Sequence, residues 1–209
     1  ELIVIHYTGM KSCAAARARL CDPAAEVSAH WLVAEDGRAE ALVPEAARAW
    51  HAGVGSWQGR DDVNSRSIGI ELANPGDRPF PEPQMAALET LLGGIMARWG
   101  IGPEGVIGHS DMAPDRKIDP GPRFDWRRLA RGGLAVWPAP GAEAAPSEEV
   151  FAALARAFGY PEAPPAVLLA AFRLRFRPRH EGPLDGLDMA LVADLAARFG
   201  ADGDSWRSA

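Results

Sequence analysis

The residues best suited to bind a metal ion occur beside short apolar segments. His6 follows the apolar run at residues 2–5, His109 follows residues 106–108, and Asp119 comes ten residues after His109. Two imidazoles and one carboxylate, with a fourth position left for water, form the ligand set of a catalytic zinc site rather than a structural one. By spacing alone, structural roles for these three residues remain open.

A glutamate interrupts another apolar segment, residues 67–72. Because side chains alternate along a strand, Glu71 shares a face with Gly69, whereas the apolar side chains of the segment lie on the other face. This face is either the solvated side of an edge strand or the position of a general base. Gly69 leaves space beside the carboxylate, which favours the base. Lys117, two residues before Asp119, is either a surface lysine or a cation that stabilises a developing oxyanion.

These residues are far apart in the sequence, so strand ends and loops must bring them together. The pattern predicts strands at residues 2–5, 28–33, 39–43, 67–72 and 106–108, and a helix at residues 13–20. Residues 84–99 carry the clearest helical stripe, and Gly100 follows where a helix often ends. The first 137 residues therefore read as one domain of mixed α+β class.

The remainder of the chain has a different character. Residues 138–146 are rich in proline and alanine and predict a linker, and residues 147–209 predict a small domain of three helices. Ser147 is placed to cap the first of these helices. Three short helices enclose a small core, which we expect to be marginal unless the helices dock onto the first domain.

The composition excludes several classes of protein. The chain has 209 residues and a net charge of −6, which argues against a nucleic-acid partner. No apolar run approaches the roughly 18 residues that span a bilayer, and no protein partner is implied. Cys13 and Cys21 do not form a metal or redox motif, and we expect buried free thiols. The sequence begins abruptly on a strand, so we expect upstream residues to be missing, which leaves cytoplasm and periplasm both open.

Six short motifs occur in a characteristic order, and together they closely resemble the zinc-dependent N-acetylmuramoyl-L-alanine amidases. These enzymes are related to peptidoglycan recognition proteins and to amidase-type phage lysozymes. The resemblance covers residues 2 to about 137. The motifs are His6-Tyr7-Thr8, Ser28-Ala29-His30, Trp50-His51-Ala52-Gly53, Ser67-Ile68-Gly69-Ile70-Glu71, Gly108-His109-Ser110-Asp111 and Lys117-Ile118-Asp119-Pro120.

The resemblance implies a fold and a set of roles. The fold is a mixed β-sheet flanked by helices, with the metal in a surface groove. His6, His109 and Asp119 are implied to bind one Zn²⁺ per chain, and Glu71 and Lys117 match the catalytic acidic and basic positions. The implied reaction is hydrolysis of the amide between the lactyl group of N-acetylmuramic (or 1,6-anhydro-N-acetylmuramic) acid and L-alanine, in bacterial peptidoglycan or in muropeptides during peptidoglycan turnover or recycling.

Four further residues are candidates for contact with the substrate. His51 is expected to line the groove and Trp57 to lie at its edge, while Asn64 and Asn74 either bind the stem peptide or cap turns. Two other motif residues are expected elsewhere: His30 is interpreted as structural or as a support for the metal ligands, and Trp50 as a core residue. No role is assigned to His180.

The three-helix segment resembles a peptidoglycan-binding module, on the strength of residues 158–160 and 171–178. Arg173 replaces the usual glutamine, so sugar binding and simple buttressing of the amidase both remain open. For the whole chain, the alternative to an amidase is a non-catalytic peptidoglycan-recognition module, which typically lacks a zinc ligand. An unrelated zinc peptidase is disfavoured because the sequence has no HExxH helix.

Overall fold

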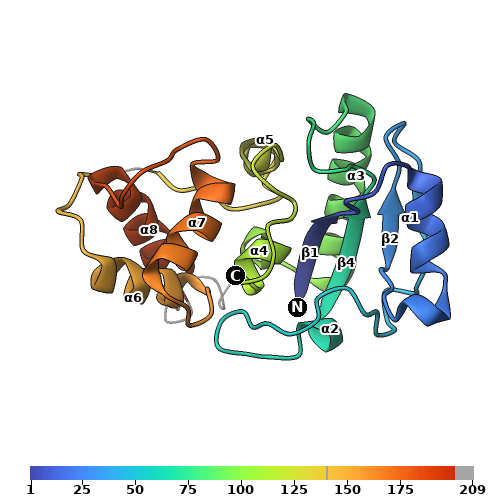
Figure 1. Ribbon diagram of the computed structural model, residues 1–209, viewed down its shortest axis with the longest axis horizontal. Coiled ribbons are helices and arrows are strands. Elements are labelled where there is room, and N and C mark those ends of the chain that lie inside the picture. Colours follow the sequence, from blue (N-terminus) through green and yellow to red (C-terminus); the bar gives the residue numbers. More distant parts are fainter. Residues whose placement is uncertain (140, 201–209) are drawn as a thin grey trace.

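A five-stranded sheet forms the centre of the computed structural model, which describes residues 1–139 and 141–200. The strands are β1 (Leu2–Tyr7), β2 (Trp31–Val33), β3 (Ala39–Ala41), β4 (Ser67–Leu72) and β5 (Val106–Gly108), in the order β3-β2-β4-β1-β5. All neighbouring strands are parallel except β2 and β3, which form an antiparallel hairpin. The sheet is therefore mixed, as expected (Figure 1).

Helices surround the sheet and make up the C-terminal part. They are α1 (Cys13–Leu20), α2 (Val63–Arg66), α3 (Glu82–Trp99), α4 (His109–Met112), α5 (Trp126–Arg131), α6 (Glu148–Phe158), α7 (Pro165–Phe176) and α8 (Gly186–Phe199), with 3₁₀ turns at Pro23–Ala25 and Pro103–Gly105. The predicted long helix begins two residues early and ends at Gly100, whose left-handed conformation suits glycine. Ser147 caps α6 as predicted.

Alternation along the strands separates two packing faces. Ile3 and Ile5 of β1 face the layer that contains α3, and both are fully buried. Leu2 and Val4 belong to a second core on the opposite face. Because His6 is two residues beyond Val4, its side chain lies on the face of the second core. The face that carries the candidate metal ligand is thus the face away from α3.

The second core joins the N-terminal part, residues 1–137, to the three C-terminal helices. Trp57 is fully buried against Phe158 and Tyr160, with ring centroids 5.4 Å away in each case. A Cβ added to Gly159 would lie 2.7 Å from the Trp57 ring, so only glycine allows this approach. The helices dock on the side of α4, as Figure 1 shows. The small helical core therefore does not stand alone.

Several sequence-based expectations need correction. β1 continues to Tyr7, so His6 lies within the strand, because pairing with β4 extends through Tyr7 and Leu72. The predicted strands at 28–33 and 39–43 shrink to three residues each. Both cysteines are free, but Cys13 is partly exposed and Cys21 is exposed, so their expected burial is wrong.

The described residues of the predicted linker, 138–139 and 141–146, contain no helix or strand. The end of the predicted helical domain, residues 201–209, lies outside the described residues. Within the part of the chain that is described, no helix is long and apolar enough to cross a membrane.

Candidate metal centre

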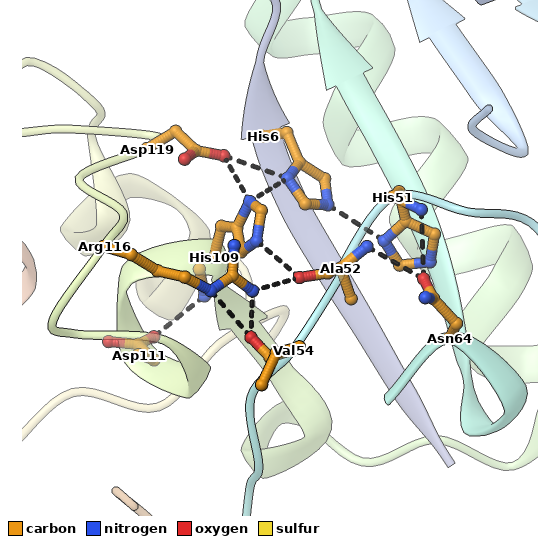
Figure 2. Close-up of polar contacts among 10 residues, drawn as sticks. His6, His51, Ala52, Val54, Asn64, His109, Asp111, Arg116 and Asp119 are labelled. Atoms are coloured by element: carbon orange, nitrogen blue, oxygen red, sulfur yellow. Dashed lines mark hydrogen bonds and ion pairs between the residues drawn. The ribbon is translucent and has the colours of Figure 1, made fainter. Parts of the chain in front are cut away.

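Three ligand atoms converge at one edge of the sheet. Nδ1 of His6 lies 2.9 Å from Nδ1 of His109 and 2.9 Å from Oδ2 of Asp119. Nδ1 of His109 lies 3.1 Å from the same Oδ2, so the three atoms form a triangle. All three residues are buried. Figure 2 shows the two rings and the carboxylate pointing at a common centre. The structure thus brings together the three residues that the sequence singled out.

The topology explains this convergence. β1 and β5 are adjacent and parallel, so His6 near the end of one strand lies beside His109, which directly follows the other. Asp119 lies in the loop after α4, and its carbonyl accepts a hydrogen bond of 2.9 Å from the backbone N–H of Ser110. This bond ties the loop to the residue that follows His109.

The hydrogen bonds of His109 leave its Nδ1 unprotonated. Its Nε2 lies 2.9 Å from the carbonyl oxygen of Ala52, which can only accept, so Nε2 carries the proton of the neutral ring. The lone pair of Nδ1 therefore points at the centre of the triangle. The guanidinium of Arg116 donates to the same carbonyl and to that of Val54, which holds this loop against His109 (Figure 2).

A directional chain of hydrogen bonds orients His6. The hydroxyl of Ser67 donates to the carbonyl of Val63 at 2.5 Å, so its oxygen is left to accept from Nε2–H of His51 at 3.3 Å. Nδ1 of His51 then accepts from Nε2–H of His6 at 3.0 Å. The Nδ1 atom of neutral His6 is unprotonated as a result. His51, expected to line the groove, does so and also orients a candidate ligand.

Burial keeps the imidazoles of His6 and His51 neutral. The pKa of His6 falls to about 4, because burial and the neighbouring His109 outweigh the hydrogen bond with Asp119. The pKa of His51 is also well below its ordinary value, because burial and three nearby histidines disfavour its cation. Burial alone would raise the pKa of Asp119, but the adjacent side chains of His109 and His6 hold it well below its usual range. At neutral pH the set therefore contains the neutral imidazole of His6 and the carboxylate of Asp119.

The residues fit a bound metal ion. Two bare Nδ1 atoms and a carboxylate oxygen 2.9–3.1 Å apart present lone pairs to one another, which is unfavourable without a cation between them. Ligands about 2.0–2.1 Å from a tetrahedral zinc ion lie about 3.3 Å apart, so only a small expansion of the triangle is needed. Two nitrogens and one oxygen are donor types that zinc accepts, and the set leaves one position open.

Glu71 lies beside this triangle. It is the register partner of His6 across the β1–β4 pair, so both side chains project from the same face. Its Oε2 is buried and has no hydrogen-bond partner within residues 1–139 and 141–200. Burial, and secondly the charge of Asp119, raise the pKa of Glu71 to about 8, although Lys117 opposes this. A carboxyl group with a buried and unpaired oxygen is suited to proton transfer.

The centre opens into a cavity of about 400 Å³. Its walls include both candidate catalytic residues, Glu71 and Lys117, and the three candidate ligands. Trp50 lies at the rim and is 57% exposed, so its expected place in the core is wrong. Trp57 is fully buried, so its expected place at the groove edge is also wrong. The C-terminal helices cover Trp57 and leave Trp50 uncovered.

The side chains of Asn64 and Asn74 form hydrogen bonds with backbone groups and do not line this cavity. Oδ1 of Asn64 accepts from the N–H groups of His51 and Ala52 at 3.0 and 2.8 Å. Asn74 accepts from the N–H of Gly76 at 2.7 Å and so caps the turn after β4. Asn64 supports the candidate metal centre indirectly, because the two residues that it binds are those that contact His6 and His109.

The remaining histidines have other places. Nε2 of His30 donates to the carbonyl of Ala47 at 3.0 Å and its Nδ1 accepts from the N–H of Gly69 at 2.9 Å, which is a structural role. His180 contacts Asp185 in the C-terminal part. Sequence reasoning missed Arg116, which lines the cavity. Its position beside Lys117 was the available signal.

Comparisons with known proteins agree with this site. Residues 1–122 match the family model Amidase_2, described as N-acetylmuramoyl-L-alanine amidase. The N-acetylmuramoyl-L-alanine amidase AmiD of Escherichia coli K12 is 36% identical over 236 aligned residues, which cover 97% of this chain and 84% of that protein. The 1,6-anhydro-N-acetylmuramyl-L-alanine amidase AmpD of Haemophilus influenzae is 45% identical over 103 residues, 49% of this chain and 56% of AmpD.

Solved structures extend the likeness to the C-terminal helices. E. coli AmiD, in complex with anhydro-N-acetylmuramic acid-L-Ala-D-γ-Glu-L-Lys, superposes with a TM-score of 0.89 at 34% identity, covering 97% of this chain and 90% of that one. AmpDh3 of Pseudomonas aeruginosa, in complex with an anhydromuramic pentapeptide, superposes with a TM-score of 0.88 at 31% identity. This match covers 96% of this chain and 92% of that one. With a matching family model, a relative matched along almost the whole chain and a His-His-Asp site in place, this chain belongs to the Amidase_2 family of N-acetylmuramoyl-L-alanine amidases, a family of metal-dependent hydrolases.

Proposed function

We propose that the chain is a zinc enzyme in which His6, His109 and Asp119 hold one Zn²⁺ and that its substrate is a 1,6-anhydro-muramyl peptide. The observation that carries this proposal is the triangle of two bare Nδ1 atoms and one carboxylate oxygen on the wall of a cavity that also contains Glu71. When bound there, zinc supplies a Lewis acid for the scissile carbonyl and lowers the pKa of water.

Glu71 is proposed as the general base and acid. Its strand register places the carboxylate beside His6, and its unpaired Oε2 is free to receive a proton from the attacking water. The same carboxyl group then returns a proton to the departing nitrogen of L-alanine. Lys117 lines the same cavity, and its ammonium is proposed to stabilise the negative charge that develops on the lactyl carbonyl oxygen.

The rim of the cavity supports a compact glycopeptide as the substrate. The exposed Trp50 offers an aromatic face of the kind on which sugar rings pack, next to the space above the triangle. The relatives AmiD and AmpDh3 have been solved with anhydromuramyl peptides. We therefore propose that anhydro-muropeptides, the small fragments of peptidoglycan recycling, are cleaved in preference to the intact wall.

A non-catalytic recognition module is the alternative. Binding alone requires neither a complete set of metal ligands nor a carboxyl group with a buried, unpaired oxygen, and this chain has both within its described residues. These two features favour cleavage over recognition.

The test is product analysis on a defined substrate. The purified chain, loaded with Zn²⁺, is incubated with an anhydro-muramyl tripeptide, and products are identified by liquid chromatography and mass spectrometry. We expect free anhydromuramic acid and a peptide that begins with L-alanine, and a rate of product formation on the order of 10²-fold or more lower for the Glu71→Gln variant. Cleavage between two amino acids, or binding without any cleavage, would contradict the proposal. Equal turnover of intact sacculi would contradict the preference for small fragments.

A further inference from the structure

A buried ion pair joins the C-terminal helices to the helix that carries a candidate metal ligand. Nη1 of Arg175, on α7, lies 2.7 Å from Oδ2 of Asp111, on α4, and each side chain is only 1% exposed. Asp111 is two residues from His109, the first residue of the same helix. Figure 1 shows α7 beside α4, and Figure 2 shows Asp111 below His109. The ion pair thus links the C-terminal helices to the helix that begins with His109.

Asp111 is the residue that shapes this short helix. Its Oδ2 accepts from the N–H of Gly108 at 2.8 Å, which fixes the turn from β5 into α4. Its Oδ1 accepts from the hydroxyl of Tyr160 at 2.8 Å. A helix of four residues has no stability of its own, so its orientation depends on such contacts. Two of them, from Arg175 and Tyr160, come from the C-terminal part.

Arg175 also holds the preceding strand. Its Nη2 donates to the carbonyl of Val106 in β5 at 3.1 Å, so one guanidinium spans the strand and the helix on either side of Gly108. The guanidinium stacks over the ring of Trp126 at 4.2 Å. These contacts fix the direction in which the chain leaves β5, and His109 is the next residue.

The ion pair is poorly explained by stability alone. Transfer of both charges out of water carries a penalty that often equals their attraction, and Nε of Arg175 has no hydrogen-bond partner in the described structure. An apolar pair would fill the same space without that cost.

We propose that Arg175, assisted by Tyr160, is a positioning residue of the metal centre: through Asp111 it fixes α4 so that Nδ1 of His109 meets Nδ1 of His6 and Oδ2 of Asp119. The C-terminal helices are then a structural part of the active site. This inference rests on the proposed zinc centre. It concerns metal affinity and geometry, because Arg175 does not line the cavity.

The chain supplies a matched control two residues away. Arg173 is also buried on α7, but its partners Asp188, Gly182 and Pro183 all belong to the C-terminal part. Arg173→Met and Arg175→Met therefore remove the same kind of buried ion pair from the same helix. Only the second removes a contact to α4.

The experiment measures zinc affinity of the full-length variants by competition with a chromogenic chelator, and the visible absorption spectrum of the Co²⁺-substituted proteins. Loss of a residue that orients a metal ligand typically weakens metal binding about 10–100-fold. We expect a loss of this size and an altered Co²⁺ spectrum for Arg175→Met, and wild-type values for Arg173→Met. Tyr160→Phe, which removes one hydroxyl, should weaken binding to a smaller extent and serves as the second variant if Arg175→Met does not fold.

The inference is overturned if Arg175→Met binds zinc as tightly as the wild type, or if Arg175→Met and Arg173→Met lose zinc affinity equally. If Arg175→Met does not fold, an unchanged zinc affinity of Tyr160→Phe overturns it. Failure of the proposed function has a different signature. In that case the wild-type chain itself does not bind stoichiometric Zn²⁺.

Discussion

The ring of His51 lies directly over Gly69: a Cβ at position 69 would lie 2.4 Å from Cγ of His51. The backbone of Gly69 does not have a positive φ, so alanine is excluded by the ring and not by the conformation. The glycine in the middle of β4 therefore creates the space from which His51 orients His6. From the sequence, the space at Gly69 was predicted to accommodate the carboxylate of Glu71, whereas in the structure the ring of His51 occupies it.

Gly69→Ala should displace His51 and weaken metal binding. Without its hydrogen bond to His51, His6 loses the contact that fixes its tautomer, which typically costs about 10–100-fold in metal affinity. Chelator competition measures this change. Gly93→Ala is the control, because its Cβ meets only a side-chain carbon of Leu134 at 3.9 Å. Equal zinc affinities for the two variants would show that the His51 position does not matter.

Each of the three candidate ligands should be necessary for zinc. His6→Ala, His109→Ala and Asp119→Ala each remove one corner of the triangle, so each should lose stoichiometric zinc and activity together. Elemental analysis and an amidase assay check this, with the wild-type chain before and after chelator treatment as reference. Activity that survives complete metal removal would rule out the zinc mechanism.

Glu71→Gln should separate chemistry from metal binding. The amide keeps the size of the side chain but cannot take a proton, so zinc content should stay at one per chain while kcat falls on the order of 10²-fold or more. Steady-state kinetics and metal analysis on one preparation give both values. Loss of zinc in this variant would mean that Glu71 is a ligand and not a base.

Deletion of residues 138–209 should destabilise the whole enzyme. Trp57, Leu2 and Val4 belong to the same core as the C-terminal helices, so the truncated chain exposes apolar surface. We expect a lower melting temperature or aggregation, and parallel losses on a soluble muropeptide and on insoluble sacculi. A truncated chain that melts normally and loses activity on sacculi alone would instead identify the helices as a wall-binding tether.

Asp185 should make an acid-sensitive contribution to stability. It caps α8 and accepts from Arg177, and this hydrogen bond holds its pKa well below the ordinary 3.8. A lowered pKa in the folded state contributes stability above pH 3.8, which is lost as the pH falls towards the lowered pKa. Asp185→Ala should cost about 0.5–2 kcal/mol at pH 7 from the lost cap.

Unfolding experiments at several pH values test this contribution. The difference between wild type and Asp185→Ala should narrow below pH 3.8. Asp185→Asn keeps an oxygen that can cap the helix and removes the charge, so it should cost less at pH 7. A wild-type curve that runs parallel to that of Asp185→Ala at all pH values would contradict the assignment.

Local patterns determined much of this protein. The stripe on residues 84–99, the apolar run at 67–72 and the cap at Ser147 each depend on neighbours within a few residues, and the structure has a helix, a strand and a cap at these places. The order of short motifs was sufficient to indicate the family, and the family model and relatives confirm it. The candidate ligands were evident because few other residue types bind zinc.

Only the tertiary structure decided which tryptophan is buried and what holds the ligands. Trp50 and Trp57 lie in one loop with similar neighbours, and the C-terminal helices, about 100 residues later, cover Trp57 and leave Trp50 exposed. The contact between Arg175 and Asp111 is equally remote in sequence. Burial and hydrogen-bond partners of this kind depend on surfaces that exist only after the chain has folded, and no local periodicity encodes them.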